Sequence, residues 1–446
     1  MRLPIDRSLR AERSRTPLWL WPVLSSMAGF AAAVVSVRMH ERGLTPPVWA
    51  RWHGDSASAR TLLQAVAGSV ITVTGLTFSL TVVALQLASQ QFSPRLLREF
   101  TRDPVIKAVL SALVSTFVFT TVTLRYIQDG EPAPNLAMFV ASLLSMVALV
   151  AVLGFLTHLA RLLRVDTMML SVHDQTDRMI STYYPAYEDE RPRSPGATPP
   201  GGTDLRAETS GFVQLIVLGP LLRTASAHDL AVEVTVRPGD HVVKGTPIAT
   251  VWSGPGREPD LEEIGKAVRE GIEIGYERTI EQDVAFGFRQ LTDIAVKALS
   301  PGVNDPVTAA HAIGHVADLM VRLTGRRLGA TLHSAGRGEG RVVIPDRDLE
   351  YYLELVCGPI RRYGRHEPAV LNALLRMLRD VAVSARDDGQ REQIAFQTDL
   401  VVAGLPSEPV AHDTEQVEDM VDRVRHALNG DLRSAYRDRS GETRSI

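Results

Sequence analysis

The sequence predicts a membrane all-α region of four transmembrane helices, followed by a cytoplasmic α+β domain with a small β-sandwich-like module and a helical C-terminal part. The first third of the chain holds four long apolar segments, residues 211–255 hold β-branched runs of strand length, and helical periodicity returns after residue 255. The expected boundaries are a transmembrane domain at 1–165, a helical extension and linker at 166–210, the β-rich module at 211–255, a helical cytoplasmic domain at 256–430 and a disordered tail at 431–446.

The four apolar segments lie at about 17–37, 61–90, 105–124 and 136–159. A spanning helix needs roughly 20 apolar residues, and each segment reaches that length. The second is longer, since no formally charged side chain occurs between Thr61 and Pro94. As a helix, that stretch would measure about 50 Å against a hydrocarbon core of about 30 Å, so we expect it to tilt or to project into water.

Charge is distributed unevenly along the chain. Residues 1–160 carry 14 basic and 8 acidic groups, a balance of +6, so the overall charge of −3 leaves −9 for residues 161–446. If the N-terminus is inside, the short flanks of the segments hold eleven Lys and Arg on the cytoplasmic side and five outside. Cytoplasmic flanks are enriched in these residues, so we expect both termini in the cytoplasm. The acidic second part disfavours nucleic acid as a partner.

The polarity of the membrane region is concentrated in its second segment. Apart from Lys107 at the start of the third, none of the four segments contains Asp, Glu, Lys or Arg, and proton-coupled pumping is therefore not expected. At 100° per residue, Ser69, Thr72, Ser79 and Gln86 share a sector of about 100°, and they are the candidate pore-lining residues. Thr74, Thr77 and Thr81 form a second stripe. Either stripe could line a watery path, or could pack dry against a neighbouring helix.

A short amphipathic segment, Ser93 to Phe100, follows the second apolar segment. Ser93 resembles an N-cap, and Pro94 suits the first helical position. Arg95 and Arg98 would then lie at anionic headgroups. The segment is either a membrane anchor or a gate that joins the second helix to the cytoplasmic domain.

Residues 211–252 alternate like strands and turn at Pro238-Gly239-Asp240. This stretch resembles the turn-rich half of a biotinyl/lipoyl-type sandwich. The carrier motif of that group is absent, and Lys244 lies at a structural corner, so we expect no attached lipoyl or biotin group and no other cofactor.

The most informative run extends from Gly275 to Pro306. Ile280, Val284, Phe288 and Leu291 make one apolar helical face, the helix ends at Ser300-Pro301-Gly302, and Asp305 is expected to cap a second helix. Its polar residues are candidates for a gating surface, a subunit interface or an ion or nucleotide site, with helix capping and bridging as the structural alternative. These residues are Arg278, Gln282, Asp283, Arg289, Gln290, Asp293, Asn304 and Asp305.

Three motifs together resemble a known family. They are Ser93-Pro94-Arg95-Leu96-Leu97 after the uncharged segment, Gln282-Asp283-x-x-Phe286-Gly287-x-Arg289-Gln290-Leu291, and Leu299-Ser300-Pro301-x-x-Asn304-Asp305-Pro306. The chain is similar to the DUF2254 family of predicted bacterial membrane proteins over roughly residues 18–325. The resemblance implies a four-helix membrane region with a cytoplasmic domain, and hence a place in the bacterial plasma membrane. It carries over no catalytic residue.

No sequence motif predicts an enzyme or a metal site. A nucleophile with a matching base, a phosphate-cradling loop and a paired-carboxylate motif are all lacking, so catalysis is not expected. His311, His315 and Asp318 share a helical face, but solvent-facing or packed histidines are the favoured interpretation. The single cysteine, Cys357, is expected to be a buried packing residue.

Two hypotheses of function remain at this stage. One is a homo-oligomeric channel for an ion or small solute, built around the second helix and gated by the cytoplasmic domain. The other is a membrane-anchored scaffold or sensor without transport activity. In both cases the expected partners are the lipid bilayer and further copies of the same chain.

Overall fold

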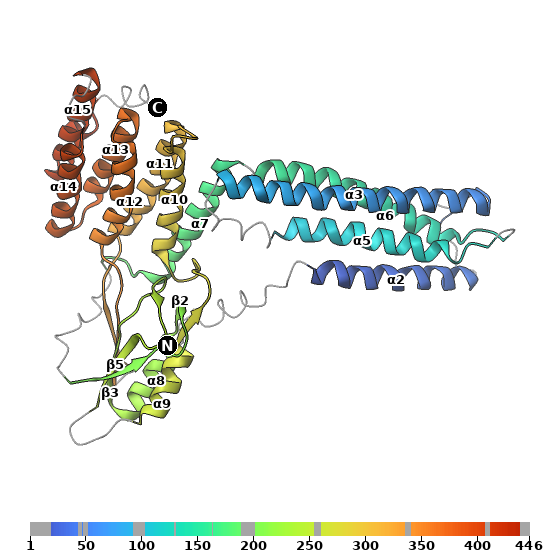
Figure 1. Ribbon diagram of the computed structural model, residues 1–446, viewed down its shortest axis with the longest axis horizontal. Coiled ribbons are helices and arrows are strands. Elements are labelled where there is room, and N and C mark those ends of the chain that lie inside the picture. Colours follow the sequence, from blue (N-terminus) through green and yellow to red (C-terminus); the bar gives the residue numbers. More distant parts are fainter. Residues whose placement is uncertain are drawn as a thin grey trace. The chain divides into compact units, whose positions relative to one another are not determined.

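The computed structural model describes residues 19–42, 47, 52–91, 103–128, 131–162, 164–188, 201–253, 260–334, 340–405 and 411–437 (Figure 1). The chain divides into two compact units, Met1–Thr167 and Met168–Ile446. The segment with Arg95 and Arg98 lies outside the described residues.

The first unit contains four helices that are long and apolar enough to cross a membrane. They are α2 (Leu20–Glu41), α3 (Ser56–Gln91), α5 (Pro104–Leu124) and α6 (Asn135–Leu162). Each overlaps one of the four predicted segments. Asp103 begins α5, because its carboxylate accepts the Val105 and Ile106 amide hydrogens and Pro104 occupies the first turn. With 36 residues, α3 is about 54 Å long.

Helix α5 is the central element of this unit, since it packs against α2, α3 and α6. Small residues allow α2 and α5 to approach each other closely. A Cβ at Gly29 would lie 2.7 Å from the Ser115 carbonyl oxygen, and the Ser25 hydroxyl donates to the Ser111 carbonyl at 3.1 Å. Small residues and hydroxyl bonds of this kind bring membrane helices together.

The second unit begins with α7 (Val165–Tyr183), most of which belongs to it, and contains two small sheets. The five-stranded sheet has the order β1-β5-β3-β8-β7, in which only β3 and β8 are parallel, and the three-stranded sheet has the order β4-β2-β6. The strands are β1 (Thr203–Arg206), β2 (Gly211–Ile216), β3 (Leu230–Val234), β4 (His241–Val242), β5 (Pro247–Ser253), β6 (Ile272–Gly275), β7 (Thr331–Ser334) and β8 (Arg341–Ile344).

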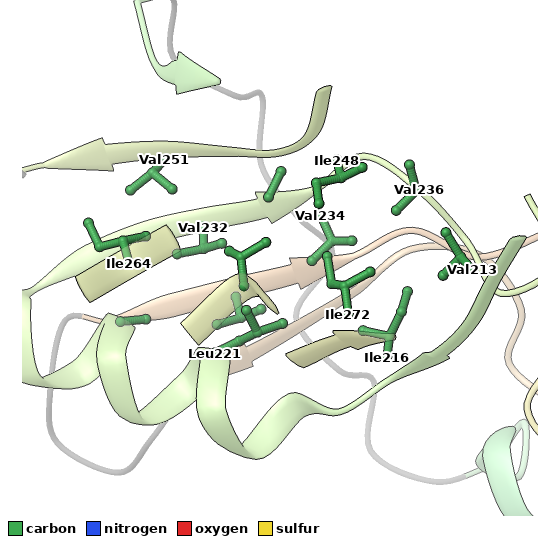
Figure 2. Packing of buried hydrophobic residues seen from close by; sticks show 14 of the residues in the cluster. Val213, Ile216, Leu221, Val232, Val234, Val236, Ile248, Val251, Ile264 and Ile272 are labelled. Carbon is green, nitrogen blue, oxygen red and sulfur yellow. The ribbon is translucent and has the colours of Figure 1, made fainter. Parts of the chain in front are cut away.

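One buried apolar cluster joins both sheets to α8 (Leu218–His228) and α9 (Leu261–Gly271) (Figure 2). Strand β3 alternates in burial, so Leu230, Val232 and Val234 all face this cluster. Leu221 of α8 and Ile264 of α9 pack into it. Alternating apolar residues on the strands and an apolar stripe on each helix thus build one core.

This arrangement differs from a self-contained sandwich at 211–255. Helix α8 interrupts the strands, and β1, β6, β7 and β8 come from outside that range, β1 from the expected linker. The β-branched run Arg341-Val342-Val343-Ile344 of β8 is typical of a strand, whereas β1, β6 and β7 have only four residues each, too few for alternation to be recognised. The structure therefore supports small mixed sheets rather than the predicted sandwich.

The rest of the second unit is helical. Its helices are α10 (Val284–Ala298), α11 (Pro306–Thr324), α12 (Leu349–Gly364), α13 (Pro368–Ser384), α14 (Asp388–Ala403), α15 (Ala411–Leu428) and α16 (Leu432–Ala435). Gly364 is the last residue of α12, whereas Gly389 lies inside α14 because Asp387 caps that helix. Cys357 is fully buried in α12, and burial raises the pKa of its thiol well above the usual range.

Residues 431–437, at the start of the expected disordered tail, are ordered in the structure. Asp431 caps α16 through the Ser434 amide, and Ala435 is fully buried. The Arg379 guanidinium lies 4.3 Å from the centre of the Tyr436 ring, and the Tyr436 hydroxyl donates to Asp380 at 2.9 Å. One buried cation under an aromatic ring thus orders the start of a segment whose composition is that of a tail.

Candidate functional site

Helix α3 presents its predicted polar stripe on a face that the chain itself leaves uncovered. The side chains of Ser69, Thr72, Ser79 and Gln86 are all exposed in the single chain. Thr72, Ser79 and Gln86 recur at intervals of seven residues. A repeat of seven gives a stripe that follows a helix in a shallow left-handed turn, as at a helix–helix seam.

The opposite side of α3 has a buried seam with the same repeat. Its members are Leu63, Val70, Thr77 and Ala84, all less than a tenth exposed. Thr77 belongs to the second predicted stripe, and the Thr81 hydroxyl donates to the Thr77 carbonyl at 2.8 Å. The two polar stripes therefore differ, because one packs inside the unit and the other does not.

Two glycines extend the uncovered face. A Cβ at Gly68 or at Gly75 would have no described heavy atom within 4 Å, in contrast to the close approach at Gly29. Of the hydroxyls on this face, that of Thr72 donates to the Gly68 carbonyl at 2.8 Å, so it is satisfied within the helix. The face thus carries polar groups and no formal charge, with the exposed side chains of Leu76 and Val83 among them.

One titratable pair in the first unit was missed by the search of the sequence. His158 lies near the end of α6, and its Nε2 is 2.7 Å from the Asp103 carboxylate that caps α5. Histidine is not one of the formally charged residues that mark a titratable group inside an apolar segment, so His158 gave no signal in the sequence. The pair links the start of α5 to the end of α6.

In the second unit, Gln282 acts as a structural bridge. Its side-chain oxygen accepts the Ile216 amide at 2.6 Å, and its side-chain nitrogen donates to the Ile216 carbonyl at 3.2 Å. Gln282 thereby pairs with both backbone groups of Ile216, the last residue of β2. The amide group of Gln282 is occupied by protein contacts.

Asp283 is the centre of a buried ion network. Its carboxylate is fully buried, 2.6 Å from the Arg278 Nε and 3.3 Å from an Arg347 nitrogen. The Arg347 guanidinium is 4% exposed and also donates to the Pro238 carbonyl at 2.8 Å. A Cβ at Gly239, which has a φ of +89°, would collide with Asp283, so the predicted turn needs glycine for two reasons. The network fixes this turn against the start of α10.

A second polar cluster, which the sequence did not indicate, lies beside the first. The Tyr184 and Tyr352 hydroxyls are 2.7 Å apart, and Tyr184 donates to Asp346 at 3.1 Å. Burial raises the pKa of Asp346 to about 6, and it raises the pKa values of both tyrosines as well. These residues come from α12 and from two segments far apart in the sequence, so no local pattern could reveal them.

The remaining predicted residues divide between structural positions and one cavity. Asp305 caps α11 through the Thr308 amide and hydroxyl, which lower the pKa of its carboxyl, and Asn304 holds the turn with a φ of +49°. Gln290 is buried in α10, and Asp293 is partly buried. Arg289 of the same helix lines a cavity of about 590 Å³.

No group of three or more His, Cys, Asp or Glu side chains that could hold a metal occurs in the part of the chain that the structure describes. Asp318 accepts from the His173 Nε2 at 2.8 Å and from the Arg322 Nε at 3.0 Å. The His315 ring lies 5.4 Å from that of His173. Asp318 is therefore engaged in protein contacts within the described chain.

The chain is similar to mycobacterial proteins that are described as uncharacterized. It is 32% identical over 400 residues to the uncharacterized proteins Rv1290c of Mycobacterium tuberculosis and Mb1321c of Mycobacterium bovis. The alignment covers 88% of this chain and 76% of each relative. No solved structure matches the chain. The family described as "Predicted membrane protein (DUF2254)" matches residues 15–380, and the chain is therefore a member of the DUF2254 family.

Proposed function

We propose that this protein is a homo-oligomeric channel for an ion or small solute in the bacterial plasma membrane, with the uncovered stripe of α3 facing the path. The single observation that supports this most is the exposure of Ser69, Thr72, Ser79 and Gln86 on a helix that is apolar enough to span the bilayer. Polar side chains gain little from lipid, so a second copy or water is the favoured neighbour.

Further features fit a passive path rather than a pump. The uncovered face carries hydroxyl and amide groups and no formal charge. Such groups can replace part of the hydration shell of a permeating ion, or can hydrogen-bond a neutral solute. The second unit, for which the balance of Lys and Arg favours a cytoplasmic location, would gate the path in this proposal. In this proposal the protein is not an enzyme.

Cysteine cross-linking tests the arrangement. Cys357 is fully buried, so a cysteine introduced on α3 would be the accessible thiol of the chain. We expect Ser79→Cys to form a disulfide-linked dimer in native membranes under mild oxidation. Phe78→Cys is the matched control, because Phe78 is also exposed but lies outside the stripe. Equal cross-linking at both positions would contradict a specific α3 interface.

Flux through liposomes tests the path itself. Purified protein should release an entrapped ion or small solute under a concentration gradient. Ser79→Leu should reduce this flux at least tenfold without loss of assembly, because a leucine at the middle of the stripe makes the path apolar. Absence of any flux under varied pH, voltage and salt would reject the channel.

A second candidate function is a membrane-anchored scaffold or sensor. The pattern Gly68-x-x-x-Thr72 and Gly75-x-x-x-Ser79 supports it, since such pairs of small residues also favour dry helix packing. Specific cross-linking at Ser79→Cys without flux would favour this function over the channel.

A further inference from the structure

The cavity of about 590 Å³ in the second unit contains a concentration of arginine side chains. Its lining includes Arg237 from the turn after β3, Arg289 from α10 and Arg362 from α12, with Arg347 and Tyr351 between them. Cavities of roughly 300 to 1,000 Å³ are typical of small-molecule sites. A lone inorganic ion would leave most of this volume empty.

Two of these guanidinium groups, those of Arg289 and Arg362, have no described electrostatic partner, whereas Arg237 is attracted by the Asp346 carboxylate. The side chains of Arg237, Arg289 and Arg362 make no hydrogen bond or ion pair with any other described residue. Arginine carries five donors and stays charged at all physiological pH values. An anion with several oxygens can bind two such groups at once.

Carboxylates also line the cavity, but most of them are already engaged. Asp346 accepts from the Tyr184 hydroxyl, Asp348 accepts the Tyr351 amide as the cap of α12, and Glu354 accepts from the Gln397 side chain at 3.1 Å. Glu350 is exposed. A hydrogen bond leaves a carboxylate charged, so these four carboxylates balance the four arginines of the lining, and Arg289 and Arg362 are the arginines left without a described partner.

A second cavity of the same unit provides a comparison. This cavity, of about 410 Å³, is also lined by three arginines. There, Arg322 pairs with Asp177 and Asp318, Arg326 donates to the Tyr184 carbonyl, and Arg386 pairs with Glu188. The three arginines of this cavity are thus bonded to the rest of the fold, unlike Arg289 and Arg362 of the larger cavity.

The wall of the larger cavity is rigid. Arg347 is held by Asp283 and by the Pro238 carbonyl, and its guanidinium covers the Tyr351 ring at 5.1 Å. Arg237 precedes Pro238 in the sequence. Arg289 lies on α10, the helix that begins directly after Asp283. A preorganised wall reduces the entropy that ligand binding must overcome.

We propose that this cavity binds a soluble phosphorylated metabolite of about nucleotide size, with Arg289 and Arg362 as the main phosphate contacts and Arg237 as a third. Guanidinium groups match the geometry of phosphate oxygens and bind them in pairs. The proposal does not depend on the channel, because binding to the full-length protein is measured without any flux.

The test is calorimetric titration of the full-length protein in detergent with pyrophosphate and with ATP. We expect saturable binding of at least one probe, weakened about tenfold by Arg289→Gln and by Arg362→Gln, since a charged hydrogen bond contributes roughly that factor. Arg289→Lys should bind with intermediate affinity, because it keeps the charge but loses the paired geometry. Arg425→Gln is the control, an exposed arginine on α15 that does not line the cavity.

Three outcomes would overturn the proposal. The first is no binding of either probe at concentrations up to about 5 mM, the upper end of weak specific affinities. The second is binding that Arg289→Gln and Arg362→Gln leave unchanged while their thermal unfolding matches that of the wild type. The third is preferential binding of short-chain phosphatidic acid, which would assign the phosphate to a lipid.

Discussion

At the scale of single residues, the polar positions of the second unit fall into two groups. Gln282, Asp283 and Asp305 are occupied by backbone groups or buried partners, and they hold turns and helix starts in place. Arg289 has no such partner and lines a cavity. The sequence presents all four as equivalent polar residues in one dense run, because periodicity shows which face a residue is on and not what it touches.

Asp346 makes the stability of the fold depend on pH. Burial raises the pKa of its carboxyl to about 6, above the value of about 3.9 expected in the unfolded chain. The folded state therefore binds the proton more tightly, and stability falls as pH rises from about 4 to about 6, by about 2 to 3 kcal/mol in all. Above pH 6 this contribution is constant.

Asp346→Asn should remove that decline. The side-chain oxygen of asparagine can still accept from Tyr184 and from the Arg347 amide, so we expect the folded state to be retained. The difference in Tm between variant and wild type should shift in favour of the variant as pH increases from 4 to 6, measured on full-length protein in detergent. Asp388→Asn, at the surface of α14, is the control. Parallel Tm profiles for Asp346→Asn and wild type would show that Asp346 does not titrate in this range.

At the scale of elements, glycine allows close helix packing on α2, whereas the glycines of α3 face no described neighbour. Gly29 brings α2 against the Ser115 backbone of α5, whereas Gly68 and Gly75 of α3 meet no described atom within 4 Å. The sequence predicts the small residues in both places. It does not show which of them pack within one chain, because that depends on how the helices are arranged.

Gly29→Ala should weaken the contact between α2 and α5. The new methyl group would meet the Ser115 carbonyl oxygen at 2.7 Å, and the helices must separate to accept it. Overpacking of this kind costs about 1 to 3 kcal/mol, so we expect a lower Tm for the detergent-solubilised protein. Gly154→Ala on α6 is the matched control, since its methyl group would enter open space. An equal change in Tm for both variants would mean that the α2–α5 contact does not limit stability.

At the scale of the whole molecule, the sequence predicts those features that a long or distinctive local pattern specifies. The four apolar helices, the uncharged stretch of α3 and the Asp305 cap were predictable, because each follows from a long run or from a cap beside a proline. The two sheets, the Tyr184–Tyr352–Asp346 cluster and the arginine cavity join segments from distant parts of the sequence. A sequence does not show which distant segments meet, so these features could not be predicted from it.

The orientation of the chain is a prediction at this same scale. Four spans return the chain to the side on which it began, and the eleven Lys and Arg on one side against five on the other indicate that this side is the cytoplasm. An impermeant maleimide should therefore label His53→Cys and Tyr126→Cys in intact bacteria, since these exposed positions follow α2 and α5. Tyr276→Cys, at a position 92% exposed in the second unit, should react only after lysis. Because the native Cys357 is buried, the wild type is the unlabelled control. Labelling of Tyr276→Cys in intact cells would reverse the orientation and would place the arginine cavity outside the cytoplasm, away from the pool of soluble nucleotides.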